Sequence, residues 1–323
     1  MDARLLEMFL RVAEAGSINR AAGLLHVSQP ALSRHIAALE HEMGTALFVR
    51  SQGGVHLTEP GRLLADRARP LLRQFAQLKE EVGDTAAGQL SIGIPPSWRR
   101  VFTTAFLQTL LAERPGIKLR VHEGVSHALR DLLLGGSLDL GMVPFDPGMA
   151  TGLAQTPVVR EPIIVVGPSR AGFRPDQPVA LGRLADLALV LPARPNVLRQ
   201  QVEQGLLRRQ LTPRVVVETD NLLLCLDLAR DGVGVTAVPA CALSGTPGAA
   251  DTQGLSWAPL RGLSLTWSMY ENTVRSHALP VREARRHALQ ILRTTLADRQ
   301  WFGAEAMPGL APAAGLPPAS AAP

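Results

Sequence analysis

Three polar residues near the amino terminus have side chains that can read DNA: Gln29, Ser33 and Arg34. A helix turns by about 100° per residue, so it would place Ser33, Arg34 and the small Ala37 on one side, with Gln29 in its exposed first turn. Gln can bond an adenine edge in two places, Arg can pair with guanine or phosphate, and Ser can bond either. This face suits the major groove of DNA.

Three short helices must position that face. Apolar residues at helical spacing predict a helix that ends near Ala15, a short helix over 18–25, and a third helix after the capping residue Ser28. The third helix would bury one stripe, formed by Leu32, Ile36, Leu39 and Met43. The free amides of its first turn also favour phosphate. Any three-helix unit shows such stripes, so periodicity alone does not establish DNA binding.

Two short extended runs follow, at 46–50 and 55–58, with Ser-Gln-Gly-Gly between them. The glycines at the turn predict a β-hairpin, which would form a wing beside the third helix. The segment up to residue 58 is therefore expected to be a winged helix-turn-helix.

The residues of this segment resemble those of the LysR-type transcriptional regulators. The resemblance is carried by Ala21-Ala22-x-x-Leu-x-Val-Ser-Gln-Pro-Ala-Leu-Ser-Arg-x-Ile-x-x-Leu-Glu, then Leu47-Phe48-x-Arg50, then Leu57-Thr58-Glu59-x-Gly61. It implies that the DNA contacts include Ser28, Gln29, Pro30, Ser33, Arg34 and, where the chain enters the wing, Arg50. Many members carry Arg at the wing tip, where this chain has Gly53, which predicts weaker selection for narrow A·T tracts.

Net charge does not support DNA binding by itself. The formal charge is +5, yet residues 1–87 contain ten basic and ten acidic residues and are neutral. The placement of the charges therefore matters more than their sum. The first residues are amphipathic and acidic, and no apolar run reaches the length of about eighteen residues that a membrane span needs, so we expect a cytoplasmic protein without a membrane partner.

A long helix is expected after the wing, because Thr58 can cap it and Glu59 and Pro60 suit its first turn. Its apolar residues alternate spacings of four and three, which is the seam of a coiled coil: Leu64, Ala68, Leu71, Phe75, Leu78 and Val82. The seam could instead pack on its own domain, but no neighbouring segment predicts a comparably long helix. We therefore expect a homodimer on an inverted-repeat operator, and the resemblance further implies a homotetramer and leaves contact with RNA polymerase open.

The rest of the chain alternates strands and helices in two series, which predicts parallel α/β lobes. The first series has strands over 90–94, 117–121 and 138–143 and helices over 98–113 and 126–134. The second has strands over 163–167, 187–191, 215–218 and 233–238 and helices over 196–209 and 221–230. A strand over 263–270 and a helix over 281–296 would return the chain to the first lobe.

The expected fold is therefore a multidomain α/β protein. It comprises a winged helix-turn-helix over 1–58, a linker helix over 59–87 and an effector domain over 88–302; the resemblance implies that this domain is periplasmic-binding-protein-like. Its lobe I would be 88–160 with 265–302, and its lobe II 161–264. Residues 303–323, rich in Ala, Pro and Gly, are expected to be a disordered tail.

Ligands of open α/β sheets bind at the carboxyl ends of the strands, where helices present free amides. The polar residues at those positions are Ser97, Ser126, Asn196, Thr219, Asn221 and Thr236. Each could also be an ordinary helix cap. Their hydroxyls and amides favour a small, polar or anionic organic effector, with Arg194 as a counter-charge.

Other classes of protein fit less well. The chain has no Gly-x-Ser-x-Gly, Walker or zinc motif, so neither an enzyme nor a cofactor is expected. Cys225 shares a helical face with apolar residues and is expected to be an inert thiol, as is Cys241, which disfavours a redox sensor. The alternative that stays open is an architectural or repressor DNA-binding protein that ignores effectors.

Overall fold

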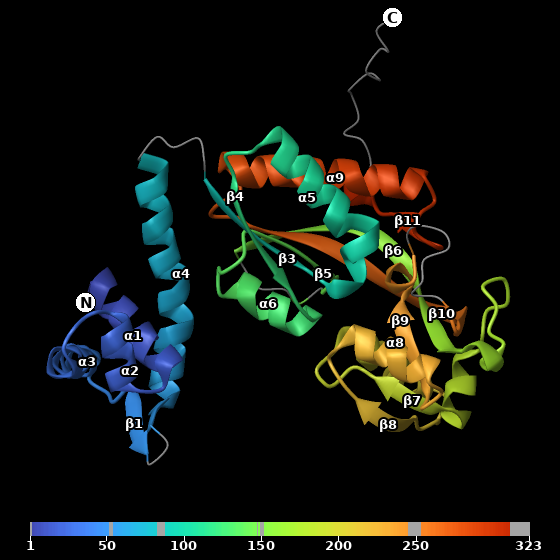
Figure 1. The fold of residues 1–323 in the computed structure, drawn as a ribbon, viewed down its shortest axis with the longest axis horizontal. Coiled ribbons are helices and arrows are strands. Elements are labelled where there is room, and N and C mark those ends of the chain that lie inside the picture. Colours follow the sequence, from blue (N-terminus) through green and yellow to red (C-terminus); the bar gives the residue numbers. More distant parts are fainter. Residues whose placement is uncertain are drawn as a thin grey trace, which may run out of the picture. The chain divides into compact units, whose positions relative to one another are not determined.

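The computed structural model describes residues 2–51, 54–82, 88–146, 148, 152–244 and 253–310, in two compact units of which the second begins at Gln89 (Figure 1). At positions 50, 51, 70, 73, 74 and 76–82 it describes the backbone alone. The wing-tip residue Gly53 and the expected tail beyond 310 lie outside the described residues. Within the described part, no helix is both long and apolar enough to span a membrane.

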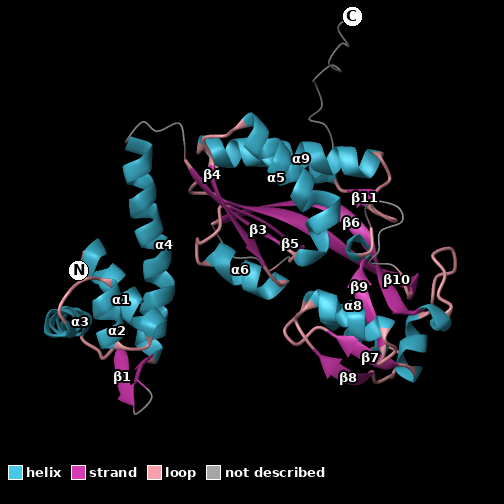
Figure 2. Ribbon diagram, in the orientation of Figure 1, coloured by secondary structure: helices cyan, strands magenta, loops and turns pink. Residues whose placement is uncertain are grey.

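The first unit contains the expected winged helix-turn-helix. Its elements are α1 (Ala3–Ala15), α2 (Ile18–Leu24), α3 (Gln29–Met43), β1 (Phe48–Ser51) and β2 (Gly54–Leu57), the last two paired antiparallel (Figure 2). The three helices are capped by the side chains of Asp2, Ser17 and Ser28. The predicted stripe of α3 is buried at Leu32, Ile36 and Leu39. Burial of this stripe leaves the opposite side of α3 exposed.

Helix α4 (Glu59–Val82) is continuous, and it begins in close contact with the wing. The hydroxyl of Thr58 donates to the carbonyl of Ala46 at 2.8 Å and accepts the N–H of Gly61 at 3.0 Å. Gly61 leaves room for this approach, because a Cβ there would lie 2.1 Å from the carbonyl oxygen of Leu47. The glycine of the motif Thr-Glu-x-Gly thus lets the helix and the wing pack backbone to backbone.

We expect Gly61→Ala to destabilise the first unit by about 1–3 kcal/mol, because the added methyl must push the wing from the helix. Gly23→Ala is the matched control: Gly23 lies in α2, with nothing within 4 Å of the position that a Cβ would take. That change should be neutral or stabilising by up to about 1 kcal/mol. Thermal unfolding of both variants followed by circular dichroism tests the difference, and equal melting temperatures would contradict it.

Over its described residues, the second unit is built on one nine-stranded sheet. Its main order is β4-β3-β5-β10-β6-β9-β7-β8. The strands are β3 (Gln89–Ile94), β4 (Lys118–Glu123), β5 (Leu140–Pro144), β6 (Leu153–Pro168), β7 (Ala188–Leu191), β8 (Arg214–Glu218), β9 (Val235–Pro239), β10 (Leu255–Asn272) and β11 (Glu305–Ala306). The helices are α5 (Thr104–Glu113), α6 (Ser126–Leu134), α7 (Val197–Leu207), α8 (Leu222–Arg230) and α9 (Leu279–Ala297).

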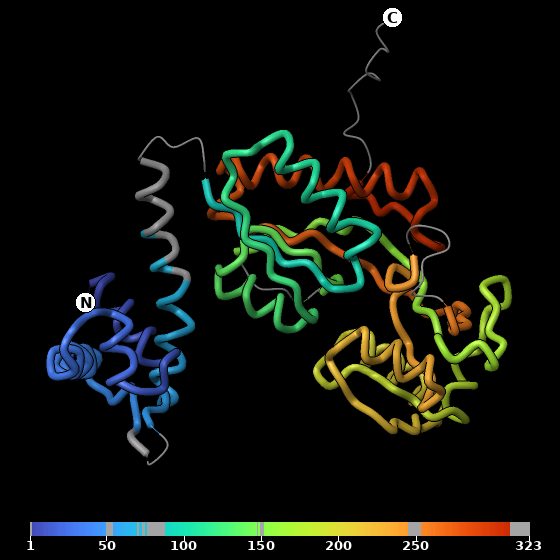
Figure 3. Tube along the Cα trace, in the orientation of Figure 1, coloured from blue at the N-terminus to red at the C-terminus, as the bar shows by residue number. Residues whose placement is uncertain are grey.

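Two long strands, β6 and β10, connect the two halves of this sheet and run side by side, antiparallel (Figure 3). β10 pairs with β5 in one half, and β6 pairs with β9 in the other, both antiparallel. The remaining pairs, β3 with β4 and β5 and β7 with β8 and β9, are parallel. The parallel series expected from the sequence are therefore present, but the strands that join them are antiparallel and longer than predicted.

The segment after α9 corrects an expectation. Residues 303–310 were predicted to be disordered, yet β11 pairs with β6 and Leu310 is buried. Trp301, just before this segment, is also buried. Two large apolar side chains thus hold this stretch on the sheet, which its Ala, Pro and Gly content does not reveal.

Candidate functional site

The outer side of α3 presents the predicted DNA-reading residues to solvent. Gln29, Pro30 and Arg34 are exposed, and Ser33 is half-buried. The amide of Gln29 donates to the hydroxyl of Ser33 at 2.8 Å, which orders two of the expected contacts before any ligand arrives. Ser28 caps the helix through the N–H of Ala31 at 3.4 Å, so its oxygen is engaged while its hydroxyl hydrogen can still donate.

A carboxylate that the sequence reasoning did not select joins this helix to the wing. One oxygen of Glu40 accepts the backbone N–H groups of Leu47 at 2.7 Å and of Phe48 at 3.1 Å. Glu40 therefore fixes the wing relative to the recognition face of the same helix. The backbone of Arg50 pairs with Val55 in the wing, but the side chain of Arg50 lies outside the described residues.

The predicted seam of α4 divides into two parts, which is a correction. Ala68 is buried in the core of its own helix-turn-helix, and Leu64 packs against the same core. Packing on its own domain, the alternative to dimerisation, therefore accounts for the beginning of the seam. Further along, Leu71 and Phe75 are 46% and 61% exposed and so remain free for a partner. The side chains of Leu78 and Val82 lie outside the described residues.

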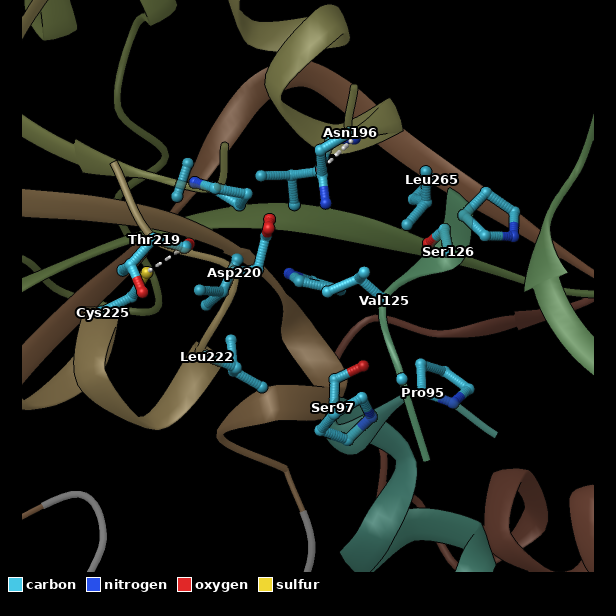
Figure 4. A pocket seen from close by; sticks show the side chains of 18 of the residues that line it. Pro95, Ser97, Val125, Ser126, Asn196, Thr219, Asp220, Leu222, Cys225 and Leu265 are labelled. Atoms are coloured by element: carbon cyan, nitrogen blue, oxygen red, sulfur yellow. Dashed lines mark hydrogen bonds between the residues drawn. The ribbon is translucent and has the colours of Figure 1, made fainter. Parts of the chain in front are cut away.

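The second unit contains a cavity of about 80 Å³ between the two halves of the sheet. The N-terminal ends of α6, α7 and α8 lie along it, at Ser126, at the cap Asn196 with Leu198, and at Leu222, so three helix N-termini are close to one space (Figure 4). The structure brings four of the predicted residues to this cavity: Ser97, Ser126, Asn196 and Thr219. They come from both halves of the sheet, as a ligand-dependent closure would require.

Two predicted effector residues do not line the cavity. Asn221 is exposed and borders a neighbouring recess of about 720 Å³, where its side-chain oxygen caps α8. Thr236 is buried behind the wall, with its hydroxyl beside the thiol of Cys225. Arg194 is not a counter-charge either, because its exposed guanidinium pairs with Glu203 at 2.8 Å. No Arg, Lys or His lines the cavity among the described residues.

The remaining wall is apolar and was not predicted. It includes Pro95, Pro144, Pro192, Leu265 and Trp267, and Asp220 is the one acidic residue in the lining, as far as the structure describes the chain. Leu265 and Trp267 belong to β10, an antiparallel strand that crosses beneath the cavity, so the rule for the carboxyl ends of parallel strands could not find them. Asp220 could have been predicted from the sequence, because it lies between Thr219 and Asn221, which were both assigned to the effector site.

A buried arginine holds the α7 side of the cavity in place. The guanidinium of Arg199 donates to the carbonyl of Pro192 at 3.0 Å, to Glu203 at 2.8 Å and to Glu218 at 2.7 Å. The hydrogen bond from Arg199 lowers the pKa of Glu218. Because Pro192 and Asn196 flank the cavity on this side, the network fixes both the wall and the N-terminus of α7.

Both cysteines have the properties of inert thiols. Burial raises the pKa of Cys225 to about 11, and it raises the pKa of Cys241 well above the usual value. A sensing thiol needs a lowered pKa, since the thiolate is the reactive form. The geometry therefore disfavours redox chemistry at Cys225, although this residue lines the cavity.

Comparisons with known proteins agree with the two units. Residues 3–62 match the family described as bacterial regulatory helix-turn-helix protein, lysR family, and residues 83–297 match the LysR substrate binding domain. The chain is similar to the nitrogen assimilation regulatory protein nac of Klebsiella aerogenes, with 32% identity over 311 residues that cover 93% of this chain and 98% of that protein. The relative and the matched helix-turn-helix family are both described as regulatory proteins.

Solved structures support the fold. A full-length OxyR variant from Pseudomonas aeruginosa has a TM-score of 0.63 at 24% identity, covering 94% of this chain and 96% of that chain. CbnR complexed with its target DNA has a TM-score of 0.64 at 22% identity, covering 90% and 100%. The fold class and the family resemblance expected from the sequence are confirmed.

Proposed function

Because this chain belongs to the LysR family of bacterial transcriptional regulators, we propose that it binds its operator through the outer side of α3 and responds to a small organic anion in the cavity of the second unit. The DNA contacts would be Ser28, Gln29, Pro30, Ser33, Arg34 and Arg50. The exposed Leu71 and Phe75 of α4, together with Leu78 and Val82, would join two copies, so that two recognition helices meet two inverted half-sites. The protein would act in the cytoplasm, where its operator lies.

The convergence of three helix N-termini with Ser97, Ser126, Asn196 and Thr219 on one cavity carries the effector proposal. The side-chain oxygen of Asn196 is occupied as the cap of α7, which leaves its NH₂ group free to donate. Asn196 and Asn221 already accept two backbone N–H groups each at the starts of α7 and α8. The N–H groups that these caps leave free, two serine hydroxyls and this NH₂ group are donors suited to a carboxylate. The apolar wall would hold the organic part of the effector, and the small volume favours a compact one.

A thermal-shift screen of the purified chain against small mono-, di- and aromatic carboxylates tests this proposal. An anion present at a hundredfold its Kd should stabilise the protein by roughly 2.7 kcal/mol. Ser97→Ala should lose this stabilisation, because Ser97 lies in the cavity, whereas Ser169→Ala, an exposed serine outside it, should retain it. If no anion raises the melting temperature, the effector-independent DNA-binding protein becomes the better account.

A further inference from the structure

A single buried carboxylate lies behind the effector cavity and accepts three N–H groups. Glu161, on the connecting strand β6, is 1% exposed. Its Oε1 accepts the indole N–H of Trp267. Its Oε2 accepts two more, the indole N–H of Trp301 and the backbone N–H of Cys241, both at 2.7 Å. The three donors come from β10, from the segment after α9 and from the segment after β9, so Glu161 ties together the parts of the chain that meet where the sheet changes halves.

Two of these contacts lead directly to the cavity. Trp267 lines it, with the edge of its ring held by Glu161. Cys241 does not line it, but its thiol is a hydrogen-bond partner of Ser97, which does. Trp98, adjacent to Ser97, packs edge-to-face on both Trp267 and Trp301, with ring centroids 5.3 Å and 5.1 Å apart. Movement of the Glu161 carboxylate would therefore displace two residues of the wall, Trp267 and Ser97.

The third contact is made by Trp301, which lies just before the segment that was expected to be disordered. Trp301 precedes β11, whose Glu305 pairs with Arg160 and whose Ala306 pairs with Val159 on β6. This pairing holds Trp301 next to Glu161 without bringing it into the cavity lining. A change at Trp301 can therefore alter the carboxylate without removing an atom from the effector site.

The arrangement suits an ionised carboxylate. A carboxylate only accepts hydrogen bonds, so it satisfies three donors, whereas a protonated carboxyl or an amide places a hydrogen among them. Arg160, next in sequence, extends instead to Ser264 at 3.0 Å. In the described part of the chain, the titratable group beside Glu161 is the Cys241 thiol, and no cation is recorded there. Burial raises the pKa of Glu161 to about 6, against the lowering effect of four hydrogen bonds, from the three N–H groups and from the thiol of Cys241.

We propose that Glu161 is the positioning residue of the effector cavity: as a carboxylate it holds Trp267 in the wall and Cys241 against Ser97, and when it is protonated the wall loosens. This inference rests on the proposed effector site. It gives the cavity a dependence on mild acidity that the hydroxyl groups lining it would not confer.

The sign of the effect separates wall loosening from unfolding. The pKa of Glu161 in the folded chain is raised from 4.5 to about 6, so protonation favours the folded state, and the stability that it contributes is lost as the pH rises through 6. A transition near pH 6 on acidification therefore cannot be an unfolding step driven by this group. A transition that Glu161→Gln removes reports a local change around the indoles.

Tryptophan fluorescence of the full chain between pH 5 and 7.5, with acrylamide as quencher, tests the proposal without any effector. The emission should change with a midpoint near pH 6, and quenching should increase on the acid side. Glu161→Gln should remove the transition and show the acid-side quenching at every pH. Trp301→Phe should move the midpoint to higher pH, because it deletes a hydrogen bond that favours the ionised form.

A flat profile in the wild-type chain would overturn the proposal, as would an unchanged transition in Glu161→Gln. If that variant fails to fold, Trp301→Phe decides, since a midpoint that stays in place or falls would also overturn it. The effector proposal fails separately: an intact transition beside a screen in which no carboxylate binds would contradict the effector site and leave the link between Glu161 and Trp267 standing.

Discussion

Asp139→Ala should destabilise the second unit by about 3–5 kcal/mol, because it strands a buried guanidinium without its partner. The side chains of Asp139 and Arg275 are 1% and 6% exposed and lie 2.9 Å apart. Asp139 also accepts the N–H of Ser91 at 2.7 Å, and Arg275 donates to the carbonyl of Gln89 at 3.2 Å. The pair therefore anchors the start of β3, where the chain enters the unit, to the start of β5 and the segment after β10.

Thermal unfolding of the full chain measures this effect, which should lower the melting temperature of the second unit by roughly 10 °C. Arg174→Ala is the matched control, since it breaks an Arg–Asp pair whose side chains are 63% and 64% exposed. Solvent screens that pair, so its loss should leave the melting temperature of the second unit unchanged. Replacing both Asp139 and Arg275 with apolar residues should cost less than Asp139→Ala alone. If Asp139→Ala is as stable as the wild type, the pair does not anchor β3.

Arg34→Ala should abolish operator binding at physiological salt while the oligomer stays intact. Arg34 is exposed on the outer side of α3, and no ion pair is recorded for it among the described residues. A lost base contact costs about 1–3 kcal/mol, and a dimer loses it at both half-sites. Fluorescence anisotropy with labelled operator measures the affinity, and light scattering measures the oligomer.

Arg11→Ala serves as the control for charge, because Arg11 is an exposed arginine of α1 that pairs with Glu14 at 3.2 Å, outside the recognition face. It should bind operator as the wild type does. Retention of wild-type affinity by Arg34→Ala would refute the assignment of this face to DNA.

Local rules predicted most of the first unit. The caps Ser17 and Ser28 and the apolar stripe of α3 are short-range features, and they are found where the sequence placed them. Glu40 was missed because its role depends on backbone groups seven and eight residues away. Ala68 was predicted to contact a partner helix but lies in the core of its own unit. The same spacing of apolar residues fits both kinds of packing, so the sequence could not separate them.

Long-range features of the second unit were harder to predict. Pro157 and Pro162 argue against a strand over 153–162, but the pairing of β6 with β10 shifts register next to both prolines and so accommodates them. The cavity residues that stand at helix starts were predicted by the rule that ligands bind at the carboxyl ends of parallel strands. Trp267 was not predicted, because it lies on an antiparallel strand, which the rule does not cover. Arg194 failed as a counter-charge because Glu203, nine residues on, is a closer partner.

Operator binding by the wild type and by a Ser97→Ala, Ser126→Ala variant, each with and without a carboxylate that stabilises the wild type, tests the central claim most directly. Both serines line the cavity and neither belongs to the DNA-binding unit. The two proteins should bind operator with similar affinity when no anion is present, and the anion should change the binding of the wild type alone. An equal response in both proteins would contradict the account and place the effector site elsewhere.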